Sequence, residues 1–386
     1  MDFAFSADQN AFRQEICDFL AKERPEAASG LYLDNESDDT WLRQRAFIHK
    51  LAAKRWLTLA WPEEHGGLAA DPMSQLVYNE EMAYQRAPTQ LGVGPDRVGP
   101  TIMLYGTDDQ KRQFLPAIAA GDAIFCQGFS EPGSGSDLAS LQTRAVREGD
   151  DYVVNGQKIW TSYAHRAEWM ILLARTDAEA PKHKGISYLL MDMESPGVTV
   201  RPLFDMLGRA HFNEVFFEDV RVPRSNLVGE ENRGWYVATA TLDFERSGIN
   251  RIIAGQKIYE DLVEFARQSK SVSPASRHRL AEHGIEFEVG RLLAYKVAWM
   301  QSQGLVPNAE ASISKLFGTE LQQRVARTGL QLLGPAGALK PGSRWSALQG
   351  RLERYYLSTA SLTVAAGTSE IMRNIIAGRG LGLPRG

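Results

Sequence analysis

One segment of the chain concentrates residue types that bind anionic ligands. The stretch from Gly128 to Ser140 reads GFSEPGSGSDLAS and carries glycines, hydroxyls and carboxylates. Gly133 and Gly135 allow positive φ and a close approach of the backbone, so nearby amides and the hydroxyls of Ser134 and Ser136 can face an anion such as a pyrophosphate. Short glycine motifs often match by chance, and a flexible linker between domains has a similar composition. Composition alone leaves both interpretations open.

A second segment follows almost directly and favours the binding loop. Tyr152 to Ser162 reads YVVNGQKIWTS, a hairpin pattern centred on its Asn-Gly turn that would bring an aromatic ring and two hydroxyls together. Together, GFSEPGSGSD and NGQKIWTS resemble the flavin-binding core of the acyl-CoA dehydrogenase family. The similarity extends from the helical start at Phe5 to the C-terminal GTSEIMRNIIAGRGLGLPR.

The resemblance implies FAD as the cofactor. A flavin ring is flat and largely apolar with a polar edge, so its site needs an aromatic face and fixed hydrogen-bond partners. Trp160 would supply that face, and the alternative is an ordinary buried core tryptophan. By resemblance, Ser162 lies near the reactive N5 of the flavin, and Ser136 reaches the pyrophosphate. The implied cofactor-binding residues are Phe129 (through its amide), Ser130, Ser136, Trp160, Ser162, Gln331, Gly334, Thr368 and Glu370.

Two departures from the family pattern affect the part of the site that would hold the adenosine diphosphate. The chain reads Gly334-Pro335 where the family usually has paired glycines, and QSKSVS over residues 268–273 where it usually has Arg-x-x-Phe-Gly. The missing arginine would have paired with the pyrophosphate from across a subunit boundary. Lys270 and Arg277 are the candidates to replace it.

The reaction implied by the resemblance needs a carboxylate base. Dehydrogenation of an acyl thioester requires removal of the α proton while a hydride leaves Cβ, and burial would raise the pKa of the base toward neutrality. Many family members carry this carboxylate directly before the Gly-Thr of the C-terminal motif, where this chain has Ala366. Others carry it just before an arginine on the first helix of the C-terminal domain, where this chain reads LDFER over residues 242–246. Glu245 is therefore the predicted base, and the alternatives are Asp243, Glu370 or a merely solvated glutamate.

The resemblance also implies contacts to the substrate. The backbone amide of Ala366 would bind the thioester oxygen and stabilise the charge that develops there, a role that needs no side chain. Arg246 would organise the pocket mouth and the coenzyme A portion. The implied substrate-binding residues are Ser136, Asp243, Arg246 and Gly367.

The spacing of apolar residues predicts the elements that must position these groups. Helical spacing dominates residues 1–121, short β-branched and aromatic runs bounded by turn residues occupy 122–230, and helical spacing returns over 231–386. We therefore expect an α+β multidomain fold with an N-terminal helical domain, a central antiparallel β-barrel or sandwich and a C-terminal helical bundle. The expected helices cover a start capped at Ser6, then 41–59, 74–84, 107–120, 235–268, 281–303, 309–333 and 355–377, and the expected strands cover 152–154, 169–174, 186–191, 198–202 and 214–222.

Bulk properties narrow the function classes. A chain of 386 residues with a net charge of −4 has no overall attraction to nucleic acid or anionic membranes. Its two cysteines, Cys17 and Cys126, have no Cys-x-x-Cys spacing, which fits a reducing cytosol. The N-terminus lacks a signal-peptide pattern, no window approaches the span of a bilayer, and the histidines are scattered, so we expect a cytoplasmic protein without a metal site.

The predicted activity is α,β-dehydrogenation of an acyl-CoA to a 2-enoyl-CoA in fatty acid or lipid catabolism, with an electron-transfer flavoprotein as the acceptor. The family resemblance implies a tetramer built as a dimer of dimers, and the missing arginine leaves a heteromer with a paralogue open. Two alternatives are a flavin oxidase or monooxygenase on the same fold and a degenerate subunit of a heteromeric dehydrogenase. A base on the earlier helix is compatible with branched, long or polycyclic acyl groups.

Overall fold

The computed structural model describes residues 4–24, 37–243, 248–269 and 272–384. The chain divides into two compact units. The first, called the helical unit, comprises Met1–Asn35, Asp71–Pro88 and Arg246–Gly386, and the second, called the sheet unit, comprises Glu36–Ala70 and Thr89–Glu245.

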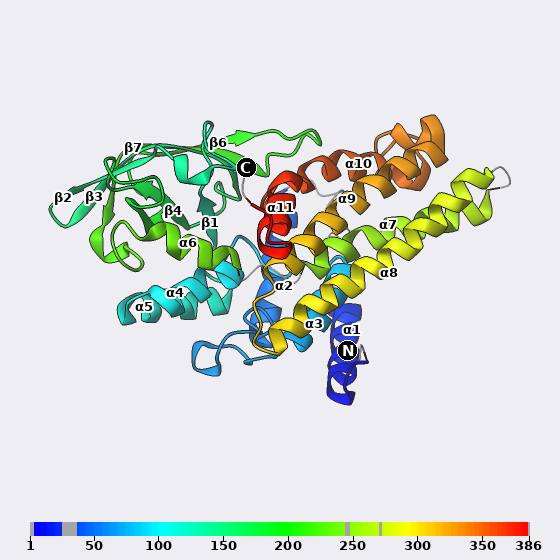
Figure 1. The fold of residues 1–386 in the computed structure, drawn as a ribbon, viewed down its shortest axis with the longest axis horizontal. Helices are drawn as coiled ribbons and strands as arrows, with labels where there is room; N and C mark the ends of the chain where they lie inside the picture. The colour runs from blue at the N-terminus through cyan, green and yellow to red at the C-terminus, as the bar shows by residue number, and fades with distance from the viewer. Residues whose placement is uncertain (1–3, 25–36, 244–247, 270–271, 385–386) are drawn as a thin grey trace. The chain divides into compact units, whose positions relative to one another are not determined.

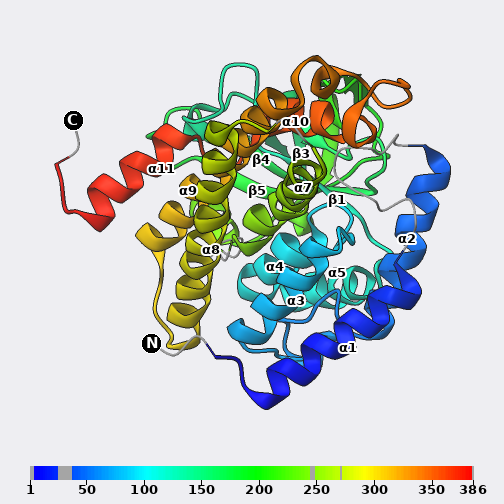
Figure 2. The same cartoon turned by 90° about the vertical axis from the view of Figure 1, so that its right-hand side faces the viewer.

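The helical unit is a bundle of long helices (Figure 1). Local signals define several of its helix ends: Ser6 and Gln9 form a capping box at the first helix, and Ser273 caps a helix that starts with proline. Its core gathers apolar side chains such as Ile252, Leu321 and Tyr355. Helices α8 (Pro274–Ser302) and α9 (Asn308–Leu333) pack beside α7 (Ile249–Gln268), and Figure 2 shows α11 (Ser369–Ile375) beside α9. The helices are α1 (Ala7–Glu23), α3 (Pro72–Tyr84), α7 (Ile249–Gln268), α8 (Pro274–Ser302), α9 (Asn308–Leu333), α10 (Arg351–Leu362) and α11 (Ser369–Ile375).

In its described residues, the sheet unit combines four α-helices with one sheet. Thr107 and Gln110 form a capping box at the start of α5, and Gly121, in the left-handed conformation, ends it as predicted. The helices are α2 (Asp38–Ala53), α4 (Gly99–Tyr105), α5 (Asp108–Ala120) and α6 (Gly234–Asp243), with a π-helix, η3, at Gly94–Val98.

The sheet has seven strands in the order β1-β4-β2-β3-β7-β6, and β5 lies off this path, paired antiparallel to β4. Strand β4 is buried on both faces: Ile171 and Leu173 pack with α5 residues, and Met170 and Leu172 pack with Val215 on the other face. The strands are β1 (Phe125–Gly128), β2 (Arg144–Glu148), β3 (Asp151–Ser162), β4 (Trp169–Arg175), β5 (Ile186–Asp192), β6 (Val198–Leu203) and β7 (Phe212–Pro223). The predicted architecture is confirmed, although β1 and β2 each pair with β4 in parallel rather than antiparallel fashion.

Three predicted helix spans are wrong, and the span 281–303 begins too late, because Ser273 caps α8 at Pro274. The span 235–268 is two helices, because Gly248 takes a left-handed φ of +68° and starts α7 anew. The span 355–377 is also two, since Ala366 and Gly367 have φ of +53° and +90°. The span 41–59 ends at Ala53 and begins earlier, because Ser37 caps α2.

The predicted hairpin within residues 152–162 is wrong as well. β3 is one continuous strand, and its turn lies before it, between β2 and β3. The Asn-Gly pair instead sits at a register shift in the β3–β7 ladder between Val154 and Gly156. A Cβ on Gly156 would lie 2.7 Å from the Thr143 Cα, so the glycine permits close backbone packing rather than a turn.

No helix in the described part of the chain is both long and apolar enough to cross a membrane.

Candidate functional site

The loop after β1 is a built element of the sheet unit. It begins at Phe129, directly after β1, and leads into β2, so the loop connects strands of one sheet rather than two domains. Glu131 and Ser134 exchange backbone hydrogen bonds of 2.9 and 3.0 Å, and the Ser134 hydroxyl donates to the Asp137 carbonyl at 3.0 Å. The linker interpretation is therefore wrong.

The two glycines of this loop do not act as expected. Neither Gly133 nor Gly135 takes a positive φ, so this prediction is wrong. A Cβ built on either glycine meets no heavy atom within 4 Å. No protein atom therefore occupies the space that a side chain at either position would fill. Ser136, between them and Asp137, is exposed.

Trp160 is not a core residue. Its side chain is 60% exposed, and its φ of +60° falls at a register shift between Lys158 and Thr161 in the β3–β7 ladder. The indole meets the Phe212 ring edge-on at 5.9 Å. The buried-tryptophan alternative is thereby excluded, and an aromatic surface is available on β3.

The structure brings four of the predicted flavin contacts together. The Ile159 amide donates to the Ser130 carbonyl at 2.9 Å, which ties the loop to β3 directly beside Trp160. Ser162 lies at the end of the same strand, opposite Phe212. The Phe129 ring is buried against Tyr188, which leaves its backbone as the part that a ligand could use.

Three predicted residues near α6 are described only in part or not at all. Glu245 and Arg246 lie outside the described residues. Asp243 is the last residue of α6, and only its backbone is described.

The helical unit holds a second group of predicted residues, in the turn between α10 and α11. Thr368 caps α11 by accepting from the Ile371 amide at 3.2 Å. Lys315 on α9, 5% exposed, donates from its Nζ to the Gly367 carbonyl. Ala366 precedes this glycine in the left-handed region, so its amide belongs to a turn whose shape is held from α9.

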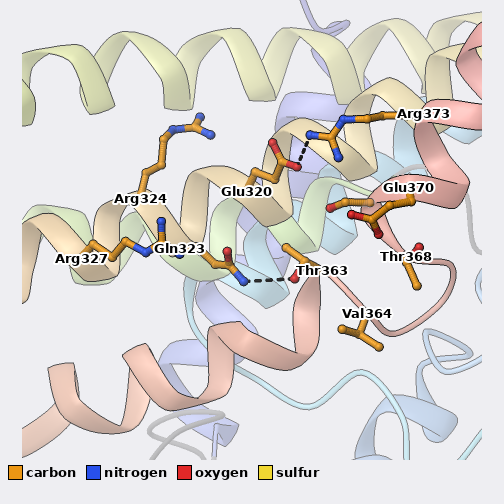
Figure 3. Close-up of a pocket in the computed structure, with 10 residues that line it drawn as sticks. Glu320, Gln323, Arg324, Arg327, Thr363, Val364, Thr368, Glu370 and Arg373 are labelled. Carbon is orange, nitrogen blue, oxygen red and sulfur yellow. Dashed lines mark hydrogen bonds and ion pairs between the residues drawn. The ribbon is translucent and has the colours of Figure 1, made fainter.

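A pocket of about 580 Å³ opens beside this turn (Figure 3). Within it, Arg373 pairs with Glu320 at 2.6 Å, and the Gln323 amide donates to the Thr363 hydroxyl at 3.1 Å. Hydrogen bonds from its own backbone amide and from Thr368 lower the pKa of Glu370 below its usual value. The lining residues are Glu320, Gln323, Arg324, Arg327, Thr363, Val364, Thr368, Ser369, Glu370 and Arg373.

This lining fits a ligand that carries phosphates and ribose hydroxyls. Arginine side chains suit phosphate, and hydroxyls and carboxylates suit ribose. Ser369 is 6% exposed, and its hydroxyl has no hydrogen-bond partner in the described part of the chain. Sequence reasoning missed Arg324 and Arg327, which stand three residues apart on one face of a predicted helix, a spacing that could have identified them.

Gln331 and Gly334 are placed apart from this group. Gln331 accepts a hydrogen bond from Arg279, and Gly334 ends α9 with φ of +55°. Neither lines the pocket that contains Thr368. No cluster of His, Cys, Asp or Glu in the described ranges could hold a metal ion.

Comparison with known proteins assigns the chain to a family. Three family models match in order: "Acyl-CoA dehydrogenase, N-terminal domain" over residues 6–122, "Acyl-CoA dehydrogenase, middle domain" over 126–220 and "Acyl-CoA dehydrogenase, C-terminal domain" over 232–381. The chain is 37% identical to the acyl-CoA dehydrogenase IpdE1 of Mycobacterium tuberculosis, with 98% of each chain covered.

Solved structures agree with this assignment. The Tcur3481-Tcur3483 steroid ACAD matches with a TM-score of 0.89 and 35% identity over 100% of each chain. The ChsE4-ChsE5 complex from Mycobacterium tuberculosis matches with a TM-score of 0.88 and 38% identity, again over 100% of each chain. The chain therefore belongs to the acyl-CoA dehydrogenase family of flavoprotein oxidoreductases, which act on CH–CH groups.

Proposed function

We propose that this chain is an FAD-dependent acyl-CoA dehydrogenase that converts an acyl-CoA to its 2-enoyl-CoA. One observation carries most of the proposal. Ser130 and Trp160, which the family resemblance implies as flavin contacts, are brought together by the bond between the Ile159 amide and the Ser130 carbonyl. They occur in a chain that matches all three domains of a family known to bind FAD.

Two groups of residues would hold the cofactor. In the sheet unit, Ser130, Ser162 and the exposed Trp160 would contact the flavin, and Ser136 would face the pyrophosphate. In the helical unit, Gln331, Gly334, Thr368 and Glu370 would contact the adenine and ribose parts of a cofactor bound to a neighbouring subunit. Bound FAD would supply the acceptor for the hydride that leaves Cβ, and an electron-transfer flavoprotein would then take up the electrons.

The protein's own part of the reaction is proton removal and charge stabilisation. Glu245 would remove the α proton, and a dry surrounding would raise its pKa toward neutrality. The Ala366 amide would donate to the thioester oxygen as negative charge develops there. Arg246 and Gly367 would contact the substrate, together with Ser136 and Asp243.

The substrate and the assembly are proposed from the relatives. Because one matched structure is titled a steroid ACAD, we propose a CoA thioester of a steroid-derived, polycyclic acyl group. Another is a complex of two different chains. Since this chain lacks the Arg-x-x-Phe-Gly motif, a tetramer that includes a paralogous partner is the assembly we propose. A cytoplasmic location completes the proposal.

The test is a panel of acyl-CoAs assayed with an artificial electron acceptor. It compares the wild type with Glu245→Gln and with Asp243→Asn, because Asp243 is the neighbouring alternative for the base. We expect Glu245→Gln to lower kcat by about 10²–10⁴-fold, the usual contribution of a positioned base, while FAD stays bound. Asp243→Asn should lower kcat far less. Full turnover by Glu245→Gln would exclude it as the base.

A degenerate, non-catalytic subunit is the second candidate. The altered segment at residues 268–273 favours it, because that segment lacks the arginine that would pair with the pyrophosphate of a partner's FAD. Purified protein that stays colourless after FAD is added, alone and with its partner, would support this candidate. Yellow protein that an acyl-CoA bleaches without oxygen would exclude it.

A further inference from the structure

Lys158 is a charged residue with no access to solvent. It lies on β3, its side chain is 0% exposed, and its Nζ donates to the Glu131 carboxylate at 2.8 Å and to the Phe129 carbonyl at 3.0 Å. Glu131 is itself only 6% exposed. Both partners lie within the sheet unit, and neither has a role in the proton removal proposed above.

Glu131 joins the two ends of the loop after β1. Its carboxylate accepts from the Gln142 amide at 2.6 Å and from the Thr143 amide at 2.9 Å, eleven and twelve residues further along the chain. Its own backbone pairs with Ser134. One buried carboxylate therefore closes the segment 131–143 into a compact loop and connects that loop to β3.

Stability alone does not account well for a buried ion pair. A buried ion pair repays little more than its desolvation, and well-packed apolar residues of similar volume often serve as well. The pair affects the geometry of the loop more than its stability, because a hydrogen bond weakens steeply when donor and acceptor are misaligned. The ion pair therefore selects one arrangement of the loop against the strand.

That arrangement sets the candidate flavin contacts. Lys158 binds the carbonyl of Phe129, whose amide and whose neighbour Ser130 are implied to meet the flavin. Two residues further along β3, Trp160 takes a φ of +60°, a conformation that a side-chain-bearing residue adopts only when its surroundings impose it. The pair thus lies where loop and strand are joined, two residues along β3 from the exposed Trp160.

We propose that Lys158 and Glu131 are a positioning pair that fixes the loop 129–143 against β3 and thereby sets the placement of the flavin. This inference rests on the proposed function, because it presumes that FAD binds at these residues. Lys158 and Glu131 act through Phe129, Ser130 and Trp160, and they do not touch the reacting atoms.

The ionisation of the two groups agrees with this role. Burial lowers the pKa of Lys158 to about 8, against the opposing charge of Glu131. Burial alone would raise the pKa of Glu131, but the Lys158 charge and the two amide bonds more than offset it and leave that pKa lowered. Both groups are therefore charged near neutral pH, and the pair is intact.

The experiment measures FAD binding by the full-length protein in its native assembly. The variants are Lys158→Met, which removes the donor, and Lys158→Gln, which keeps a neutral donor and is the milder change. The control is Lys182→Met, since Lys182 forms an exposed ion pair with Asp137 of the same loop at 2.9 Å. Each variant is checked for folding by circular dichroism. FAD affinity, the absorption band of the bound flavin, kcat and KM are then recorded.

We expect Lys158→Met to weaken FAD binding at least tenfold and to shift the absorption band of the flavin that still binds, with a smaller loss in Lys158→Gln. Lys182→Met should match the wild type. A folded Lys158→Met with wild-type affinity, band and kcat would overturn the positioning role. Failure of both variants to fold would also overturn it, since the pair would then serve folding alone. A wild type that binds no FAD would instead overturn the proposed function.

Discussion

Lys315 provides the sharpest test of how the turn at Ala366 is held. Lys315 is almost fully buried on α9 and donates to the Gly367 carbonyl. The turn contains two consecutive left-handed residues, and only one of them is a glycine. Replacing Lys315 by Met removes the donor while keeping most of the side-chain volume.

The magnitude follows from two opposing contributions. A hydrogen bond from a charged donor contributes about 1.5–3 kcal/mol. Holding one non-glycine residue in the left-handed region costs about 1–2 kcal/mol. The hydrogen bond stabilises the turn by more than the left-handed strain destabilises it. Loss of the bond should therefore let the turn relax. We expect Lys315→Met to lower the free energy of unfolding by about 2 kcal/mol. If the Ala366 amide moves by about 1 Å as a result, kcat should fall by up to about 100-fold.

A second substitution separates strain from other effects. Ala366→Gly relieves the left-handed strain, so it should add about 1 kcal/mol of stability to the wild type and less in the Lys315→Met background, where the turn has already relaxed. Urea unfolding measures the stability, and the acyl-CoA assay measures kcat.

Lys257→Met is the matched control, because Lys257 forms a partly exposed pair with Glu260 at 3.4 Å in the same unit. Its effect on stability should stay within about 0.5 kcal/mol. Wild-type stability and turnover in Lys315→Met would refute the reasoning.

Two further predictions concern the carboxylate of Glu131 and a carboxylate introduced at Ala366. The folded-state pKa of Glu131 is lowered from 4.5, so its carboxylate contributes stability that is present above that pH and is lost as the pH falls through the folded-state pKa. Urea titrations should therefore show Glu131→Gln less stable than the wild type by about 3–5 kcal/mol at neutral pH, with the gap closing as the pH falls below 4.5; a gap independent of pH would contradict this. Ala366→Glu, added to Glu245→Gln, places a carboxylate where many family members carry their base, so it should recover at least about tenfold of the lost kcat. No recovery in a double variant that still binds FAD would count against Glu245 as the base.

Local signals in the sequence identified most elements correctly. The capping boxes at Ser6 and Thr107 and the left-handed Gly121 determine helix ends through neighbouring residues, so α1 and α5 could be predicted from short windows. Two strands were missed. β1 has only four residues, and β2 shows mostly exposed charged side chains, so neither presents the apolar run that marks a buried strand.

The spacing of apolar residues predicted helix α8 but did not predict correctly which side of the helix is buried. The predicted stripe runs along one side of the helix through Ile285, Val289, Leu292, Lys296, Val297 and Met300. Its first three residues are 67%, 41% and 44% exposed, whereas Val297 is fully buried. The buried side instead includes His283, whose ring bonds to Thr328 at 2.9 Å, and Phe287. Which stripe of a helix is covered depends on what packs against it, and the spacing within one helix does not contain that information.

The sequence by itself determined the family, the order of helical and β regions and the residue types of the candidate flavin contacts, because these depend on composition, spacing and short motifs. Only the tertiary structure decided that Trp160 is exposed and that Lys158, an ordinary charged residue in the sequence, is buried against Glu131. Burial and partnership arise from segments distant along the chain, such as Glu131 and Lys158, which lie 27 residues apart. Interactions between residues close in the sequence determine which helices and strands form, and packing between distant segments determines which of their side chains are in contact.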